Sequence, residues 1–312
     1  MRVAVVDIGL NSTRLLIADA NRGGSIKELL RRSEVTRLGD GVDAHGALSQ
    51  QAIERVLRTL ADYRREIDRH RCEANFAVLT AAVREAANGA QFAARVREQF
   101  ALDAHVLSGD EEAQLTFLGA MSDERLERRA SASEPVVVID IGGGSTEFVV
   151  GHDRAAGFHI SLPVGVVRMS ERHIHHDPPA PVELQRLARD ARAVFAQRLP
   201  PHELAAVRSA IAVAGTATSA AAMDQALDPY DPTRVHGYVL SKTSIHTLLE
   251  RTAAMTEAQR RSLAGLHPDR APTIIAGLII LGEALCAFEL DEATVSERDV
   301  LFGGAMRVAG LG

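Results

Sequence analysis

The chain contains one motif twice, and this internal repeat limits the folds open to it more than any other feature. Residues 3–13, VAVVDIGLNST, return as residues 136–146, VVVIDIGGGST, with 7 of 11 positions identical at an offset of 133 residues. Each copy is a short β-branched run followed by a carboxylate and a polar turn, the pattern of a buried strand that ends in a loop. A chain of 312 residues that carries this unit twice is expected to form two related α/β domains.

The two loops have the chemistry of an oxyanion-binding site. Glycine lets the backbone approach a phosphate closely, and the Ser and Thr hydroxyls can donate further hydrogen bonds. The carboxylate at each strand end, Asp7 or Asp140, can hold a divalent cation or order a water molecule. The copies diverge just after the loop, where the first continues with Arg14 and the second with Glu147. One loop is therefore suited to holding negative charge, and the other to holding metal and water.

The overall composition is that of an ordinary folded protein with a small negative charge. Hydrophobic residues make up 46% of the chain and charged residues 24%, with a net charge of −6. A general binder of nucleic acid or of membrane surfaces would carry a basic surplus, so we expect neither partner. An anionic ligand therefore has to be bound by locally placed groups.

The cysteines and the apolar segments indicate in which cellular compartment the protein is expected. Cys72 and Cys286 are too few for a disulfide framework and have no CxxC spacing, which favours a reducing cytoplasm. Only four apolar residues, 3–6, precede Asp7, fewer than a signal peptide needs. The apolar stretch 274–281 is interrupted by Gly277 and is shorter than the roughly 20 residues of a membrane span. We expect a cytoplasmic protein.

Hydrophobic spacing and turn residues predict strands that alternate with helices in both halves. Strands are expected over residues 3–8, 14–18, 76–79, 105–107, 136–141, 147–151, 156–162, 211–214 and 294–296. Helices are expected over residues 50–70, 90–100, 271–288 and 299–308, and from Asp110 behind the capping residue Ser108. Residues 215–218, GTAT, are expected to form a turn after the strand 211–214. The polar stretch 121–135 is the predicted linker. This gives an N-terminal domain of residues 1–124 and a C-terminal domain of residues 125–312, whose final helix is free to pack back on the first domain.

Several segments together resemble one protein family. Besides the two Asp-x-Gly loops, they are TAAVREA at 80–86, VLSGDEEA at 106–113, SLPVG at 161–165, VAGT at 213–216, VHG at 235–237 and GLHPDRA at 265–271. This ordered set is similar to the exopolyphosphatase and guanosine pentaphosphate phosphohydrolase (Ppx/GppA) family. That family belongs to the superfamily of actin, hexokinase and the Hsp70 ATPase, and the resemblance runs nearly end to end.

The resemblance implies an α/β fold of two duplicated actin-like ATPase domains, each ribonuclease H-like, with the active site in the cleft between them. Family members hydrolyse the terminal phosphoanhydride of inorganic polyphosphate or of guanosine pentaphosphate (pppGpp), with Mg²⁺. We therefore expect an exopolyphosphatase-type hydrolase with Mg²⁺ as cofactor. Because the family commonly forms dimers, we also expect a homodimer.

The same resemblance assigns roles to residues of this chain. Glu112 matches the family's catalytic glutamate and is expected to be the general base that activates water. Asp140 and Glu147 match carboxylates that order metal and water, and Asp7 is expected as a further metal ligand. Substrate contacts are expected from Asn11, Ser12, Arg14, Arg84, Gly142, Gly143, Gly144, Ser145, Thr146, Gly215 and Thr216.

Some of the residues in these motifs could instead have a purely structural role. Glu111 and Glu112 suit an ordinary helix first turn, and residues 142–144 suit a structural turn. Arg14 and Arg84 could instead form ion pairs.

Histidines elsewhere leave similar alternatives. His173, His175 and His176 look like a metal cluster, but their spacing does not converge on one helix face, which favours solvated surface. For His236 and Arg270, packing or capping is as consistent with the sequence as substrate contact.

Functional alternatives remain open at this stage. The nearest is a pppGpp 5′-phosphohydrolase, and a kinase of the same superfamily is more distant. A phosphate- or nucleotide-sensing binding module would keep the site without turnover, although four acids around an anion argue against it. Leu10 stands where the family usually has a small hydroxyl residue, which removes one donor from the first loop. The chain ends at Gly312, before the helical region of longer members, which favours short polyphosphate or a nucleotide over long chains.

Overall fold

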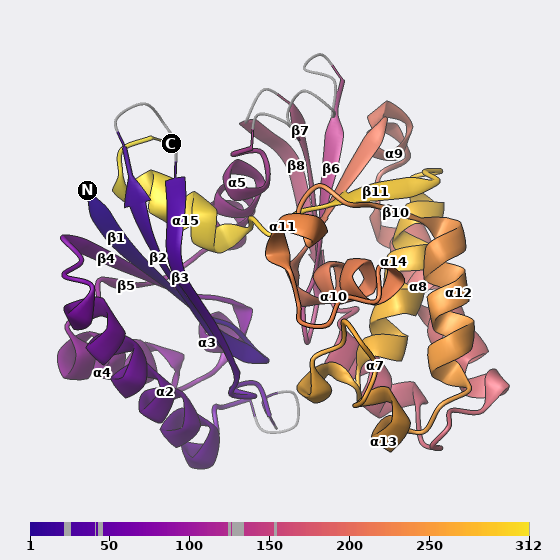
Figure 1. Cartoon of the computed structure of the whole chain (residues 1–312), viewed down its shortest axis with the longest axis horizontal. Helices are drawn as coiled ribbons and strands as arrows, with labels where there is room; N and C mark the ends of the chain where they lie inside the picture. The colour runs from indigo at the N-terminus through magenta and orange to yellow at the C-terminus, as the bar shows by residue number, and fades with distance from the viewer. Residues whose placement is uncertain are drawn as a thin grey trace. The chain divides into compact units, whose positions relative to one another are not determined.

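The computed structural model describes residues 1–21, 26–40, 42, 46–123, 126, 134–152 and 155–311, and it divides into two compact units (Figure 1). Unit 1 consists of Met1–Ser122 and Arg298–Gly312, and unit 2 of Asp123–Glu297. The division predicted between residues 124 and 125 lies outside the described residues. The last segment of the chain is part of unit 1, so this unit is built from both ends of the sequence.

Unit 1 is built on a five-stranded sheet in the order β3-β2-β1-β4-β5. Strands β1 (Arg2–Ile8), β2 (Ser12–Ala20) and β3 (Ile26–Val35) are antiparallel neighbours. Strands β4 (Ala74–Leu79) and β5 (Ala104–Val106) continue the sheet parallel to β1. The predicted strands 3–8, 14–18, 76–79 and 105–107 are confirmed within a few residues.

Helices cover both faces of this sheet. On one face, Ala4 and Val6 share a buried cluster with residues of α2 (Gln50–Arg69) and α4 (Gly89–Phe100). On the other, Val3 and Val5 pack with α5 (Gly109–Ala120) and α15 (Val300–Val308). Because successive side chains of a strand point to opposite faces, the apolar residues of β1 pack against the helices on both faces of the sheet. The short helix α3 (Ala81–Glu85) follows β4.

Two glycines let α15 lie directly against α5. A Cβ on Gly303 would lie 1.9 Å from the Leu115 carbonyl oxygen, and one on Gly119 would lie 1.9 Å from that of Asp299. Such distances exclude any side chain at either position, because backbone atoms cannot move aside as side chains can. The C-terminal helix is therefore an integral layer of unit 1.

Unit 2 repeats this topology in a six-stranded sheet ordered β10-β11-β9-β6-β7-β8. Strands β6 (Val136–Ile141), β7 (Thr146–His152) and β8 (Ala155–Leu162) form the antiparallel part, as β1 to β3 do in unit 1. Strands β9 (Ser209–Val213) and β11 (Glu292–Val295) run parallel to β6, and β10 (Val239–Ser241) pairs antiparallel with β11. The repeat in the sequence is thus also a repeat in topology.

Several helices of unit 2 contact α14 (Ile274–Ala287), whose first eight residues are all buried. This confirms the apolar helix predicted over 271–288. The other helices are α7 (Val166–His173), α8 (Pro181–Arg198), α9 (Pro201–Ala206), α10 (Ala214–Asp224), α11 (Pro232–Val235), α12 (Lys242–Ala253), α13 (Glu257–Arg260) and the 3₁₀ helix η1 (Pro268–Arg270). Within the described part of the chain, no helix has the length and apolar character needed to cross a membrane.

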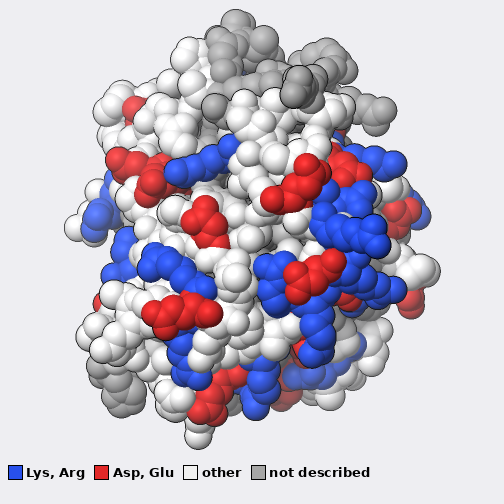
Figure 2. All heavy atoms as spheres, turned by 90° about the vertical axis from the view of Figure 1, so that its left-hand side faces the viewer, with Lys and Arg blue, Asp and Glu red and all other residues white. Residues whose placement is uncertain are grey.

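Acidic and basic side chains are interspersed on the face shown in Figure 2. Neighbouring charges on α2 form local ion pairs, such as Arg64 with Asp68 at 2.5 Å and Arg32 of β3 with Glu66 at 3.4 Å. Acidic side chains thus lie among the basic ones on the described part of this face.

Candidate active site

The first loop connects β1 to β2 in a tight turn. The Gly9 N–H donates to the Ser12 carbonyl at 3.0 Å, and the carbonyls of Leu10 and Asn11 accept from Gly39 and Arg37, both at 2.8 Å. The Leu10 side chain packs on Gly39, where a Cβ would lie 2.3 Å from Leu10 Cγ. The backbone N–H groups of Leu10 and Asn11 have no hydrogen-bond acceptor among the described residues. Leu10 thus anchors the loop by packing, while two loop N–H groups stay available to an anion.

Arg14 lies between two buried carboxylates of unit 1. It faces Asp7 across β1 and β2, and its Nε donates to Asp7 Oδ2 at 2.8 Å. Its Nη1 pairs with Asp299, the residue that caps α15 by accepting from the Leu301 N–H. Sequence reasoning missed Asp299 as a partner of Arg14, although Asp299 is the first residue of the helix predicted over 299–308, a position where acids are common. The ion-pair alternative for Arg14 is thus observed, and its predicted substrate contact stays a prediction.

Asp7 is 4% exposed, and burial raises the pKa of its carboxyl group, an effect that Arg14 only partly offsets. Both Arg14 nitrogens that pair with Asp7 use Oδ2, and Oδ1 is buried without a hydrogen-bond partner. Such an orphaned oxygen is costly unless a donor or a cation meets it. Asp7 Oδ1 is therefore a group that could take a metal ligand role, although Arg14 already supplies positive charge beside it.

The two adjacent glutamates of α5, Glu111 and Glu112, have different hydrogen-bond partners. Ser108 caps the helix by accepting from the Glu111 N–H at 3.2 Å, and Glu111 Oε2 accepts from the Ser108 N–H at 2.9 Å. This capping box lowers the pKa of Glu111, chiefly through the hydrogen bond from the Ser108 backbone. Glu111 therefore has the structural role that the sequence left open for both acids, and Glu112 is left out of the cap.

Glu112 lies beside Arg84 instead. Arg84 Nη1 donates to Glu112 Oε2 at 3.2 Å and to the Leu107 carbonyl at 2.8 Å. Both side chains are partly exposed, with 29% of Arg84 and 20% of Glu112 accessible. A guanidinium carries five N–H donors, and in the described structure no other partner takes those of Arg84. Arg84 can thus hold Glu112 and still donate to a phosphate.

The second loop joins β6 to β7 and packs on the start of α7. Its Gly142 N–H donates to the Ser145 carbonyl at 2.9 Å, and the Gly143 carbonyl accepts from Val167 at 2.8 Å. Gly165 lies directly behind the loop, because a Cβ there would come within 2.4 Å of the Ser145 nitrogen. No acceptor for the N–H groups of Gly143, Gly144 and Ser145 is found in the described structure. Three successive free N–H groups form the kind of nest that binds oxyanions.

Asp140 and Glu147 face each other across β6 and β7, as Asp7 and Arg14 do in unit 1. Two like charges directly opposite in a sheet repel each other unless a cation or donors compensate. Glu147 Oε1 accepts hydrogen bonds from Ser145 at 2.5 Å and from Ser161 at 2.7 Å. Sequence reasoning missed Ser161, although it is the first residue of the SLPVG motif.

The acid pair fits the chemistry of a magnesium site. Among the described residues, no group of three or more His, Cys, Asp and Glu side chains could hold a metal by itself. Mg²⁺ is commonly held by one or two carboxylates and completed by water and substrate phosphates, so a pair of acids suffices. Asp140 and Glu147, beside the free N–H groups of the second loop, match that requirement better than Asp7 with its arginine.

Thr146 differs from the other loop residues because it is fully buried, and its hydroxyl donates to the Val164 carbonyl at 2.5 Å. Its side chain stabilises the loop from behind. The predicted turn at residues 215–218 is wrong, since these residues form the first turn of α10. Thr216 is buried there, and the Arg270 guanidinium occupies the space of a Cβ on Gly215. Arg270 therefore packs on the start of α10, and the substrate role of Gly215 and Thr216 stays a prediction.

The histidines of unit 2 pair with acids. Nε2 of His173 lies 2.9 Å from Asp190, and Nδ1 of His176 lies 2.8 Å from Glu183. These contacts tie α7 and the following loop to α8. His176 is exposed, as the solvated interpretation predicts, whereas the His173 side chain is mostly buried. Neither histidine belongs to a group of three or more metal-binding side chains among the described residues.

His236 links the two ends of unit 2. Its Nε2 lies 3.1 Å from Asp123, and its Nδ1 accepts from the Glu297 N–H at 3.2 Å. This supports the packing interpretation of His236.

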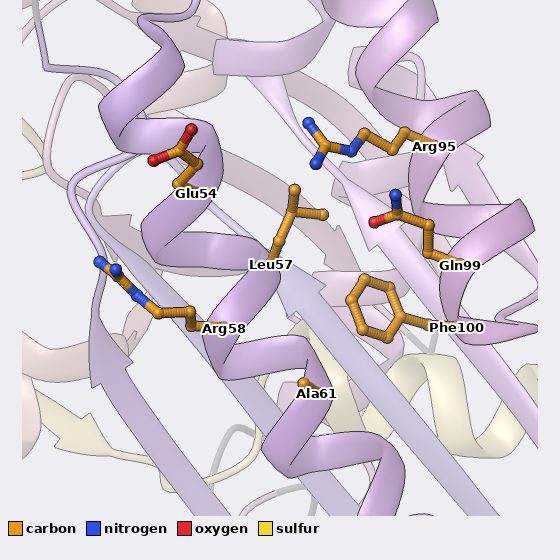
Figure 3. Close-up of a pocket in the computed structure, with 7 residues that line it drawn as sticks. All are labelled: Glu54, Leu57, Arg58, Ala61, Arg95, Gln99 and Phe100. Atoms are coloured by element: carbon orange, nitrogen blue, oxygen red, sulfur yellow. The ribbon is translucent and has the colours of Figure 1, made fainter.

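A pocket of 360 Å³ lies elsewhere on unit 1, between α2 and α4 (Figure 3). Leu57 and Phe100 contribute apolar surface, and Arg58 and Arg95 are among the residues around them. None of the predicted site residues lines it. The predicted site residues lie instead on or beside the two loops and on α3, α5 and α10.

Known proteins of similar sequence and structure establish the family of the chain. The Ppx/GppA phosphatase family matches residues 3–303. Exopolyphosphatase 2 of Mycobacterium tuberculosis is 38% identical over 325 residues, which cover 99% of this chain and 99% of that protein. The crystal structure of the Ppx/GppA family member of Aquifex aeolicus has a TM-score of 0.83 at 31% identity and covers 99% of this chain and 97% of that chain. An exopolyphosphatase structure from Cytophaga hutchinsonii, 24% identical with a TM-score of 0.87, covers 100% and 99% and shares the fold. The chain therefore belongs to the Ppx/GppA phosphatase family and has its two-domain, actin-like fold.

Proposed function

We propose that this protein is an exopolyphosphatase, which hydrolyses the terminal phosphoanhydride of inorganic polyphosphate and releases orthophosphate. The observation that carries the proposal is the pairing of Asp140 with Glu147 across β6 and β7, beside the free N–H groups of the second loop. Two facing acids next to an oxyanion nest are suited to a phosphate that arrives with a cation. The full-length similarity to Exopolyphosphatase 2 favours polyphosphate as the substrate.

In the proposed reaction the chain positions the phosphate and activates water. The N–H groups of Gly143, Gly144 and Ser145 bind oxygens of the terminal phosphoryl group, and Arg84 and the first loop contribute further donors. Glu112 accepts a proton from the attacking water, whose oxygen forms a bond to the terminal phosphorus while the bond from that phosphorus to the bridging oxygen breaks. The bridging oxygen leaves on the polyphosphate chain, now one phosphate shorter, and orthophosphate is released. Phosphoryl transfer depends mainly on such positioning and charge stabilisation, and a general base adds about 10²–10⁴-fold.

Asp140 and Glu147 would hold Mg²⁺. When bound, this ion neutralises charge on the phosphate oxygens. Chelation with EDTA should therefore abolish phosphate release, and added Mg²⁺ should restore it. Asp140→Asn should need more Mg²⁺ for half-maximal activity than the wild type, because it keeps the shape of the side chain but lacks the charge.

The two adjacent glutamates provide the decisive test of the base. Phosphate release from polyphosphate of defined length should fall at least 10²-fold in Glu112→Gln if Glu112 is the general base. Glu111→Gln is the matched control, since glutamine also fits a capping box and removes the same charge one residue away. We expect the control to keep its activity. Equal activity of Glu112→Gln and the wild type would remove the assigned base.

A pppGpp 5′-phosphohydrolase is the second candidate, favoured by the family match, which covers both activities. The two substrates share a terminal phosphoanhydride and differ in what lies behind it. Competition between short polyphosphate and pppGpp in one assay ranks them by kcat/KM. Tight binding of either compound without any product would instead support a sensing module.

A further inference from the structure

Ser161 ends a row of polar residues that crosses three strands of unit 2. Asp140 on β6 faces Glu147 on β7, and Glu147 faces Ser161 on β8. Residues directly opposite in antiparallel strands project to the same face of the sheet, so the three side chains form one line. The neighbouring Leu162 is fully buried opposite Thr146, which fixes the register of this row.

The contacts in this row are directed at a single oxygen. Ser161 Oγ lies 2.7 Å and Ser145 Oγ 2.5 Å from Glu147 Oε1, and both hydroxyls donate to it. Hydrogen bonds to an ionised carboxylate are shorter and stronger than neutral ones. Two donors on one oxygen fix the rotation of the carboxylate and offset part of the repulsion from Asp140.

Unit 1 contains the same row with a different centre. There Asp7 faces Arg14, and Arg14 faces Ser33 on β3. Ser33 is exposed, and its hydroxyl makes no hydrogen bond to the described residues. Among the described residues, therefore, only Ser161, which lies opposite an acid, donates a hydrogen bond to the central side chain of its row.

We propose that Ser161 is a positioning residue that acts with Ser145 to orient the carboxylate of Glu147 for Mg²⁺. The assignment rests on the proposed function, which places Mg²⁺ at Asp140 and Glu147. It also gives the Ser145 side chain a role beyond the phosphate contact predicted from the sequence. Groups that orient a metal ligand typically contribute 10–100-fold to metal affinity, although they do not touch the metal.

The test compares Ser161→Ala, Ser161→Thr and the matched control Ser33→Ala. Mg²⁺ binding is measured calorimetrically without substrate, and the Mg²⁺ dependence of phosphate release is measured separately. Ser161→Ala should weaken Mg²⁺ binding by about 10-fold, with kcat at saturating Mg²⁺ within about 2-fold of the wild type. Ser161→Thr keeps the hydroxyl and should restore the affinity, and Ser33→Ala should match the wild type.

Two results would overturn the assignment while leaving the proposed function intact. One is unchanged Mg²⁺ affinity in Ser161→Ala beside a wild type that binds Mg²⁺ and releases phosphate. The other is an equal loss in Ser161→Ala and Ser161→Thr, which would make packing the cause. A wild type that neither binds Mg²⁺ nor releases phosphate would overturn the proposed function and this assignment together.

Discussion

Arg14 and Asp299 form a largely buried ion pair between residues 285 positions apart in the chain. The pair connects the first hairpin of unit 1 to the start of α15, and Arg14 also holds Asp7. Both carboxylates are 4% exposed. Removing one partner from such an arrangement costs more than breaking an exposed pair, because it leaves a buried charge without compensation.

Asp299→Ala should lower the stability of the protein by about 3 kcal/mol, since it removes a buried partner of Arg14 and the cap of α15. Thermal and urea unfolding of the purified variant measure the loss. The comparison is Asp68→Ala, which removes an exposed i,i+4 partner of Arg64 and should cost less than about 1 kcal/mol. Similar losses in the two variants would contradict a special role for the buried pair.

Glu111→Ala should destabilise the protein by about 1 kcal/mol because it removes half of the α5 capping box. Glu112→Ala leaves the box intact and should change the urea midpoint much less. Glu111→Ala should therefore lower stability more than phosphate release, and Glu112→Ala should lower phosphate release more than stability. Loss of stability in Glu112→Ala alone would reverse the roles given to the two glutamates.

Gly303→Ala should destabilise unit 1 by about 3 kcal/mol, because the new methyl group would meet the Leu115 carbonyl and force α15 away from α5. Gly109→Ala is the control, because a Cβ at Gly109 has nothing within 4 Å. Alanine at this helix position should be neutral or slightly stabilising. Thermal unfolding of both variants checks the difference, and a stable Gly303→Ala would show that the helices are less closely packed.

Glu183 should make stability depend on acidic pH. Burial alone would raise the pKa of its carboxyl group, but hydrogen bonds from His176 and from the Ala180 and His175 backbone outweigh burial and lower it to about 2. A lowered pKa contributes stability that is full above the ordinary value of 4.5 and is lost as the pH falls toward 2. Glu183→Gln should therefore cost about 2 kcal/mol at pH 7 and much less at pH 3.

Urea unfolding of the wild type and of Glu183→Gln at both pH values measures this difference. Glu250→Gln, at an exposed pair with His246, is the comparison and should change little at either pH. A gap between wild type and Glu183→Gln that stays constant from pH 7 to pH 3 would show that the carboxylate charge is not what stabilises the α7–α8 connection.

Local patterns predicted much of the secondary structure and the position of the loops. The β-branched runs at 3–6 and 136–139 are buried strands, since few other arrangements satisfy a short run that is apolar on both faces. The SGDEEA segment is a capped helix start, because the capping box is formed by residues three apart. The turn expected at 215–218 is a helix instead, since packing against Arg270 and α14 decides the conformation there.

The sequence by itself determined the duplicated strand–loop–strand units, the family and the residue types of the candidate site, because these depend on neighbours in the chain and on ordered motifs. Only the tertiary structure decided which acids have which partners. In the structure, Glu111 belongs to the capping box of α5 and Glu112 accepts a hydrogen bond from Arg84. Asp299 pairs with Arg14, and Ser161 donates a hydrogen bond to Glu147. These pairings depend on sheet register and on helix packing between distant segments, and no local pattern encodes such distances.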